Sequence, residues 1–334
     1  MTSSRHLIAL GGAVLLLAVG VVACGGESGG EQVTAGLITK QEKNPFWVTM
    51  RNVAEDTAGD ENVKLLTAAG KSDVDNASQV KALEDMTAKG AKGILIAPSD
   101  STRIVPAIEK ARQAGVTVIA VDTPTRPESA ADALFATNNV QAGELIGRYA
   151  KARADEDGIR PKIAMLDLAP GITSGVQRHA GFLKGFGIRP GDPAIVGSVD
   201  TEGDKDKGRA GMARLLKENP DINIVYTVNE PAAFGAIEAL EAAGKSKDDV
   251  IVVSVDGGCD AIKKGVRPGD IDATSQQYPE NMAREGVQAI ADEGRGGQKP
   301  SGYLNTGVEL ITGDPVAGVG SRDVAFGVRN CWGD

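Results

Sequence analysis

The sequence predicts an α/β protein made of two Rossmann-like lobes. Short β-rich runs alternate with amphipathic helical segments from Val33 onward, and this alternation is typical of parallel sheets with helices on both faces. It continues for too long to suit one sheet, because a chain of 334 residues exceeds the usual size of a single compact core. Two similar lobes are the preferred interpretation, and a TIM barrel is the alternative.

The expected strands share an apolar, β-rich composition and a length of about five or six residues. Beyond a first strand that begins near Val33, they cover residues 63–68, 93–97, 117–121, 162–166, 195–199, 224–228, 250–255 and 271–275.

The expected helices repeat apolar residues at helical spacing, as Ala77, Val80, Leu83 and Met86 do. They cover residues 76–88, 104–114, 139–154, 209–217, 231–243 and 279–293, and a further helix begins at Thr173-Ser174.

The N-terminal segment has the pattern of a bacterial lipoprotein signal. Arg5 precedes an almost wholly apolar run from Leu7 to Val22, and small Ala23 precedes Cys24. The run is shorter than the roughly 20 apolar residues of a spanning helix. We therefore expect a signal peptide at 1–23, acylation of Cys24, and a flexible glycine-rich tether at 24–32. The alternative is an ordinary secreted protein in which Cys24 is incidental.

The net charge argues against some classes of ligand, and the cysteine content indicates a disulfide. The formal net charge of −9 argues against nucleic acid or an anionic membrane as the ligand, so the lipid anchor is the only membrane contact that we expect. Outside the cytoplasm, Cys259 and Cys331 indicate a disulfide; two buried free thiols are the alternative.

Several enzyme classes are disfavoured. Beyond the signal segment the only histidine is His179, which disfavours a metal site and a Ser-His-Asp triad, and there is no Gly-x-Ser-x-Gly elbow. The first strand continues into residues 39–43 without a glycine fingerprint, which excludes a dinucleotide enzyme. We expect no cofactor and no metal, and a secreted hydrolase is the enzymatic alternative.

Polar and aromatic side chains follow several of the expected strands, where ligands bind to open α/β sheets. Such side chains form the hydrogen bonds that a polyhydroxylated ligand needs and give aromatic surface to its C–H faces. One by one, these residues are ordinary caps, core rings or surface charges, but together they indicate a site. The candidates are Asn44, Phe46, Trp47, Asp122, Thr123, Arg178, Asn229, Asp256 and Gln277.

These motifs resemble the sugar-binding lipoproteins and periplasmic proteins that feed ATP-driven importers, specifically the ribose-binding type with two lobes and a hinge (type I periplasmic binding proteins). The resemblance spans nearly the whole chain beyond the signal segment. Its motifs are Asn44-Pro45-Phe46-Trp47, Val121-Asp122, Arg178-x-x-Gly181-Phe182, Val228-Asn229-Glu230, Val255-Asp256-Gly257 and Ala273-Thr274-x-Gln276-Gln277-x-Pro279. Residues 306–312 and the closing 330–333 look most like fructose-binding proteins and their polyol-binding relatives.

The resemblance implies a role for each candidate. Phe46 and Trp47 would stack on the sugar, and its hydroxyls would be bonded by Asn44, Asp122, Arg178, Asn229, Asp256 and Gln277. Ribose binders carry an arginine where this chain has Thr123, and their second-lobe ring aligns near Gly203 here. We therefore do not expect specificity for ribose itself. The expected ligand is a fructose-like hexose, another pentose or a sugar alcohol.

The resemblance also implies the organisation of the chain. Crossings between the lobes would fall near Asn138, Gln277 to Tyr278 and Thr306. The N-lobe would comprise 33–137 plus 279–305, and the C-lobe 138–278 plus 306–334.

In this interpretation the protein is a monomer, anchored on the extracytoplasmic face of the membrane, that closes on its ligand and delivers it to a permease and ATPase complex. A sugar-sensing receptor without transport is the alternative. Sugar-responsive transcription regulators are excluded, because a signal segment occupies the place of their helix-turn-helix.

Overall fold

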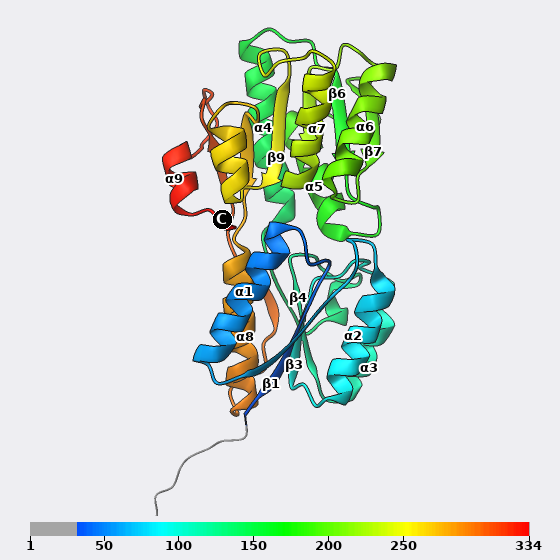
Figure 1. Cartoon of the computed structure of the whole chain (residues 1–334), viewed down its shortest axis with the longest axis vertical. Helices are drawn as coiled ribbons and strands as arrows, with labels where there is room; N and C mark the ends of the chain where they lie inside the picture. Colours follow the sequence, from blue (N-terminus) through cyan, green and yellow to red (C-terminus); the bar gives the residue numbers. More distant parts are fainter. Residues whose placement is uncertain (1–31, 334) are drawn as a thin grey trace, which may run out of the picture. The chain divides into compact units, whose positions relative to one another are not determined.

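The computed structural model describes residues 32–333, which contain two separate six-stranded sheets. The strand orders are β11-β5-β4-β3-β1-β2 in the first sheet and β12-β10-β9-β8-β6-β7 in the second. Helices cover both faces of each sheet (Figure 1). The prediction of two α/β lobes is confirmed, and the alternative of a TIM barrel is wrong because neither sheet closes into a barrel. The expected signal peptide and Cys24 lie outside the described residues.

The first sheet and its helices, which we call the N-lobe, contain only parallel strand pairs. Helices α1 and α8 cover one face, and α2 and α3 cover the other (Figure 1). The elements are β1 (Thr34–Thr39), α1 (Pro45–Asp60), β2 (Lys64–Ala69), α2 (Asn76–Ala88), β3 (Gly93–Ile96), α3 (Val105–Gln113), β4 (Thr117–Val121), the 3-10 turn η1 (Glu128–Ala130), β5 (Ala133–Ala136), α8 (Pro279–Gly294) and β11 (Gly302–Asn305).

The second sheet and its helices, the C-lobe, are parallel except for β12, which runs antiparallel to β10. Helices α4 and α5 pack on one face, and α6 and α7 pack on the other. The elements are α4 (Asn139–Glu156), β6 (Ile163–Asp167), α5 (Thr173–Phe186), β7 (Ile195–Asp200), α6 (Lys205–Glu218), β8 (Ile224–Thr227), α7 (Glu230–Ala242), β9 (Ile251–Asp256), the π-helical turn η2 (Ala261–Val266), β10 (Ala273–Gln276), β12 (Glu309–Thr312) and α9 (Val324–Arg329).

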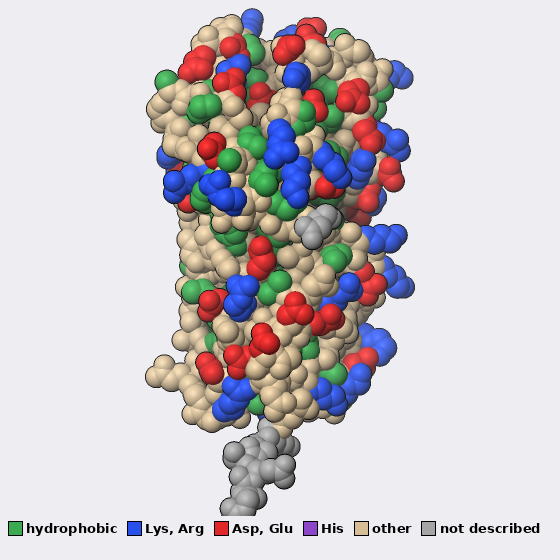
Figure 2. All heavy atoms as spheres, turned by 60° about the vertical axis from the view of Figure 1, so that its left-hand side comes forward, with side chains coloured by type: hydrophobic (Ala, Val, Ile, Leu, Met, Phe, Trp, Pro, Cys, Tyr) green, Lys and Arg blue, Asp and Glu red, His purple; other side chains and the backbone are tan. Residues whose placement is uncertain are grey.

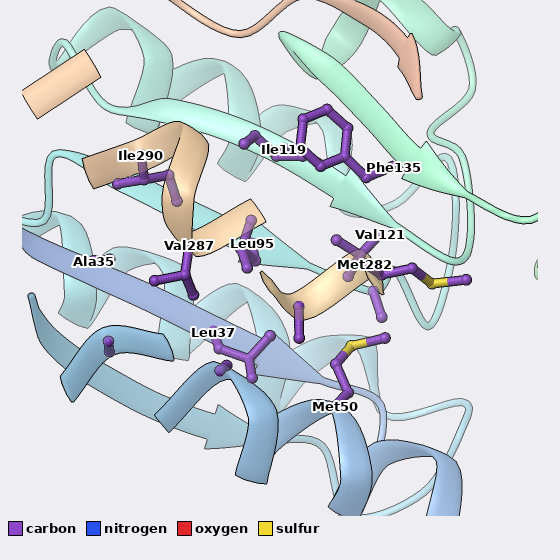
Figure 3. Packing of buried hydrophobic residues seen from close by; sticks show 14 of the residues in the cluster. Ala35, Leu37, Met50, Leu95, Ile119, Val121, Phe135, Met282, Val287 and Ile290 are labelled. Atoms are coloured by element: carbon purple, nitrogen blue, oxygen red, sulfur yellow. The ribbon is translucent and has the colours of Figure 1, made fainter. Parts of the chain in front are cut away.

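The central strands are buried on both faces, which explains their continuous apolar runs. In the N-lobe, Leu37 and Leu95 of the sheet meet Met50 of α1 and Val287 of α8 (Figure 3). Each such side chain contributes about 1.5–3 kcal/mol to folding when it is fully buried. This core fixes the strands whose carboxyl ends carry the candidate residues.

Helices α4 and α5 of the C-lobe approach each other through glycines. A Cβ atom on Gly143 of α4 would collide with the backbone oxygen of Arg178 in α5, and one on Gly181 would collide with the backbone oxygen of Val140. The close approach of the two backbones sets the position of Arg178, a candidate site residue.

Some elements differ from the expected ones. Helix α6 begins at Lys205, before the expected start at residue 209, because Asp204 caps it by accepting from the backbone N–H of Lys207 at 2.9 Å. The sequence prediction missed β5, β11 and β12, which have four residues each. Strand β11 is also exposed along its length at the edge of the sheet, so it lacks the apolar pattern of a buried strand.

The surface carries a mixture of positive and negative side chains. Figure 2 shows Lys and Arg side chains interspersed with Asp and Glu side chains over this face of the molecule.

A disulfide joins Cys259, which follows β9, to Cys331 in the C-terminal tail. Within residues 32–333, no helix is both long enough and apolar enough to cross a membrane.

We expect the variant Gly143→Ala to be less stable than the wild type by about 1–3 kcal/mol, because the added methyl group overpacks the contact between α4 and α5. Urea titration followed by circular dichroism measures this change. The matched control is Gly59→Ala in α1, where no atom lies within 4 Å of the added Cβ and a neutral or stabilising effect is expected. Equal stability changes in the two variants would contradict the role of this contact.

Candidate functional site

A small cavity lies between the two lobes, at the carboxyl ends of both sheets. Its volume is about 20 Å³, close to the minimum that holds one water molecule. The side chains around it come from both lobes. They are Lys40, Asn44, Phe46, Trp47, Asp73, Asp122, Leu168, Ser174, Arg178, Asn229 and Asp256. All the predicted ligand residues are in this set except Thr123 and Gln277, which are hydrogen-bonded to its members.

Two aspartates occupy matching places in the two lobes. Asp122 follows β4 directly, and Asp256 is the last residue of β9. Both have positive φ angles, 60° for Asp122 and 112° for Asp256. Residues other than glycine rarely adopt this backbone conformation, and it costs on the order of 1 kcal/mol or more. Both aspartates line the cavity, and backbone strain of this kind is concentrated at functional sites.

Arg178 is the cation that joins these aspartates across the lobes. Its Nη2 donates to Asp122 Oδ1 at 3.2 Å, and its Nη1 lies 3.5 Å from Asp256 Oδ1. The same guanidinium donates to Gln277 Oε1 at 3.2 Å, to Asn139 Oδ1 at 2.7 Å and to the backbone oxygen of Val228 at 3.1 Å. With 3 % of its surface exposed, Arg178 is buried with every nitrogen hydrogen-bonded.

The two aspartates differ in electrostatic environment. Burial alone would raise the pKa of Asp122, but Lys40 and Arg178 outweigh it and hold this pKa below its ordinary value. Burial raises the pKa of Asp256 to about 6, and Arg178 offsets only part of that effect. Gln277 Nε2 also donates to Asp256 Oδ1 at 2.8 Å.

Lys40 is a site residue that the sequence analysis missed. Its Nζ donates to Thr123 Oγ1 at 2.8 Å and to Asp122 Oδ2 at 3.2 Å, and it lies 5.2 Å from the centroid of the Trp47 ring. It directly follows β1, so the same strand-end argument that found Asp122 applies to it. Thr123 therefore stands beside a buried cation that comes from another strand of the N-lobe.

Thr123 also contacts the C-lobe. Its Oγ1 lies 2.7 Å from Ser174 Oγ, near the start of α5, and 2.6 Å from Asp122 Oδ2. Neither hydroxyl is more than 1 % exposed. This contact and the pair between Arg178 and Asp122 both cross from one lobe to the other.

Asp73 is a second residue that the sequence analysis missed. It lies in the loop between β2 and α2, is 3 % exposed, and lines the cavity. It belongs to no motif and follows its strand by several residues, so strand-end reasoning alone does not single it out.

The aromatic wall is built at the start of α1 and supported by the C-terminal tail. Asn44 caps α1 by accepting from the backbone N–H of Phe46 at 2.9 Å. Phe46 packs edge-to-face against Trp47 and Trp332, with centroid distances of 4.8 and 5.3 Å. Trp332 Nε1 donates to the Gln277 backbone oxygen at 2.8 Å. The adjacent disulfide thus fixes the tail behind residues of both lobes.

Asn229 and Glu230 complete the C-lobe side. Asn229 caps α7 by accepting from the backbone N–H of Ala232 at 3.2 Å, and its Nδ2 donates to the backbone oxygen of Gly203. Glu230 accepts from the backbone N–H groups of Gly258 and Ala261 at 3.0 and 3.1 Å. Burial, together with the charge of Asp256, raises the pKa of Glu230 to about 8.

The chemistry of the cavity is that of recognition. It combines carboxylates, an amide, a guanidinium and an ammonium group with aromatic rings, the set that pairs with several hydroxyls and covers C–H surface. His179 is not among the lining residues; its Nδ1 lies 2.8 Å from Asp167 Oδ1. Within residues 32–333, no group of three or more His, Cys, Asp or Glu residues is placed to hold a metal ion.

The family model described as "periplasmic binding protein domain" matches residues 35–298. The chain therefore belongs to the periplasmic binding protein family, and its two α/β lobes have the type I fold of that family.

Relatives of known function bind sugars. The chain is 30% identical over 279 residues to the ribose import binding protein of Escherichia coli, covering 83% of this chain and 90% of that protein. It is 29% identical over 282 residues to the Bacillus subtilis ribose import binding protein, covering 84% and 88%. A solved ABC transporter solute-binding protein from Actinobacillus succinogenes with bound D-allose is 26% identical, with a TM-score of 0.74 and coverage of 84% and 98%.

We expect Arg178→Met to lower the free energy of unfolding by about 3–5 kcal/mol, because it leaves Asp256 of the same lobe buried without its cation. Lys184→Met, on the same helix, is the matched control. Lys184 is 66 % exposed and pairs with Glu144, so its loss should cost about 1 kcal/mol or less. Urea titration measures both. A cost for Arg178→Met as small as that for the control would show that the buried ion pairs do not support the fold.

We also expect the free energy of unfolding to fall as the pH rises from about 5 to about 8. Burial raises the pKa of Glu230 to about 8, of Asp272 to about 7 and of Asp256 to about 6. In the unfolded chain these groups titrate near pH 4, so across this window the folded state binds more protons. Raising the pH therefore favours unfolding.

Urea titrations at several pH values measure this dependence. In Asp272→Asn, the side-chain oxygen can still accept from the backbone N–H of Val252, which the wild-type carboxylate does at 2.7 Å. This variant should lose part of the fall between about pH 4 and pH 7. A free energy of unfolding that stays constant or increases over pH 5–8 in the wild type would contradict the assignment.

Proposed function

We propose that this protein is the solute-binding component of an ABC importer that captures a monosaccharide or a sugar alcohol between its lobes. The observation that carries this proposal is the cavity itself, which both lobes line with carboxylate, amide and guanidinium groups beside aromatic rings. The family supports it, since the relatives above are named for ribose import and a related structure holds D-allose. We propose binding and delivery, and no catalysis.

In this proposal different residues contact different parts of the ligand. Asp122, Arg178, Asn229 and Asp256 bond its hydroxyls, and Gln277 holds Asp256 and Arg178 in place. Asn44 and the rings of Phe46 and Trp47 form the N-lobe wall. Lys40 joins this set as a donor beside Asp122, and Thr123 acts through its bonds to Lys40 and Ser174.

The binding step is closure of the lobes. We assign residues 33–137 and 279–305 to the N-lobe and residues 138–278 and 306–334 to the C-lobe. Sheet pairing supports this division, because β11 pairs with β5 whereas β12 pairs with β10. A cavity of about 20 Å³ is smaller than any monosaccharide. The lobes therefore part to admit the ligand, and the ligand then favours the closed form that a permease recognises.

We further propose that the chain is a monomer held at the extracytoplasmic face of the membrane by acylated Cys24, with residues 24–32 as the tether. The apolar run before Cys24 and the glycine-rich segment after it support this anchor. A tethered binding protein remains near its permease and ATPase.

Isothermal titration calorimetry with D-ribose, D-allose, D-fructose, D-tagatose, D-galactose, sorbitol and mannitol tests this function. We expect at least one compound to bind, and Asp256→Asn to weaken its affinity by about 10-fold or more, because a charged hydrogen bond is lost. The control Asp249→Asn changes the same charge on an exposed residue of the C-lobe and should bind like the wild type. Absence of binding by every compound would overturn the proposal.

A further inference from the structure

The carboxyl group of Asp73 lines the cavity with few partners of its own. It is 3 % exposed, and its one hydrogen bond among the described residues is accepted by Oδ1 from Gln41 Nε2 at 3.2 Å. Burial raises the pKa of Asp73, and the positive charge of Lys40 offsets this effect only in part. A further hydrogen-bond donor would stabilise a buried carboxylate in this position.

The indole N–H of Trp47 is a buried hydrogen-bond donor that lacks an acceptor. Trp47 is 4 % exposed, and its Nε1 has no hydrogen-bond partner among residues 32–333. Trp47 and Asp73 both line the cavity, and the Trp47 N–H acts against the rise in the pKa of the Asp73 carboxyl group. A buried donor without a partner costs about 1–3 kcal/mol, and a ligand hydroxyl in the cavity that accepts from Nε1 would remove this cost.

The orientation of Trp47 fits this use of its edge. Lys40 Nζ lies over the ring at 5.2 Å from its centroid, and Phe46 packs against it at an interplanar angle of 83°. The ring therefore has a cation over one face, and its N–H remains the group without a partner. The stacking role that the resemblance implies for Trp47 does not account for this buried donor.

Gly203 closes the same region from the C-lobe. A Cβ atom built on it would lie 3.2 Å from Asp73 Oδ2, 2.7 Å from Asn229 Nδ2 and 2.9 Å from Leu168 Cδ2. Any side chain at this position would crowd the Asp73 carboxylate. The absence of a side chain leaves the N-lobe carboxylate facing the C-lobe backbone, and any group held there meets both lobes.

We propose that Asp73 and Trp47 form a polar subsite that binds one free hydroxyl of the ligand, with the hydroxyl donating to Asp73 and accepting from Trp47 Nε1. Only a group that both donates and accepts satisfies the two partners. The subsite thus selects a polyol that keeps this hydroxyl and rejects its deoxy analogue. The inference rests on the proposed sugar-binding function and adds a determinant of specificity to it.

The test is calorimetry with the tightest-binding of the seven compounds named above, together with each of its monodeoxy analogues. In the wild type, we expect removal of one particular hydroxyl to weaken binding by at least about 100-fold, because two buried partners are left unpaired. In Asp73→Asn and in Trp47→Phe, the intact sugar should bind at least about 10-fold more weakly, and the penalty for removing that hydroxyl should shrink to about 10-fold or less.

The control is Asp75→Asn, two residues further along the same loop. Asp75 caps α2 by accepting from the backbone N–H of Ser78 at 3.1 Å and is not among the cavity residues. This variant should keep both the affinity and the discrimination of the wild type. Thermal melts check that each variant is folded, and Trp47→Phe gives a second, independent removal of the subsite if Asp73→Asn unfolds.

The outcomes separate the two proposals. If the wild type binds none of the seven compounds tested under the proposed function, that function fails. If it binds a sugar, and folded Asp73→Asn and Trp47→Phe keep wild-type affinity and wild-type penalties for every deoxy analogue, the subsite alone is overturned.

Discussion

The buried guanidinium of Arg178 is the interaction on which the rest of the site depends. It contacts Asp122 of the N-lobe and Asp256 of the C-lobe, at 3.2 and 3.5 Å. Taking these charges out of water costs several kcal/mol per ion, and this cost is offset only when the geometry and the additional hydrogen bonds are good. The fold provides both, through the strained backbone at the two aspartates and through the close glycine contact that positions α5 against α4.

The same network couples recognition to closure. The Arg178–Asp122 pair and the Thr123–Ser174 contact both cross between the lobes, so closed lobes satisfy these groups without a ligand. A sugar must insert between them and replace their contacts with its own hydroxyls. The Asp73–Trp47 subsite differs, because its two groups have unmet hydrogen-bonding capacity in the closed form. Binding energy specific to the ligand is thus expected to arise there.

The sequence predicts the architecture and much of the site for a simple physical reason. Parallel strands bring their carboxyl ends to one edge, so the predicted strands and the rule that ligands bind at this edge make Asp122, Asn229 and Asp256 candidates. Lys40 obeys the same rule, but a lysine resembles a surface charge until its partners are known. Asp73 lies in a loop, where only the tertiary structure brings it to the cavity. The strands β5, β11 and β12 are too short to show a recognisable pattern of apolar residues in the sequence.

The central claim is that the lobes close around a sugar, and small-angle X-ray scattering tests it most directly. The radius of gyration is measured with and without a saturating concentration of the tightest-binding sugar found by calorimetry. We predict that the ligand-free protein has the larger radius, and that the sugar reduces this radius. An unchanged radius, with binding demonstrated by calorimetry in the same sample, would contradict closure as the mechanism.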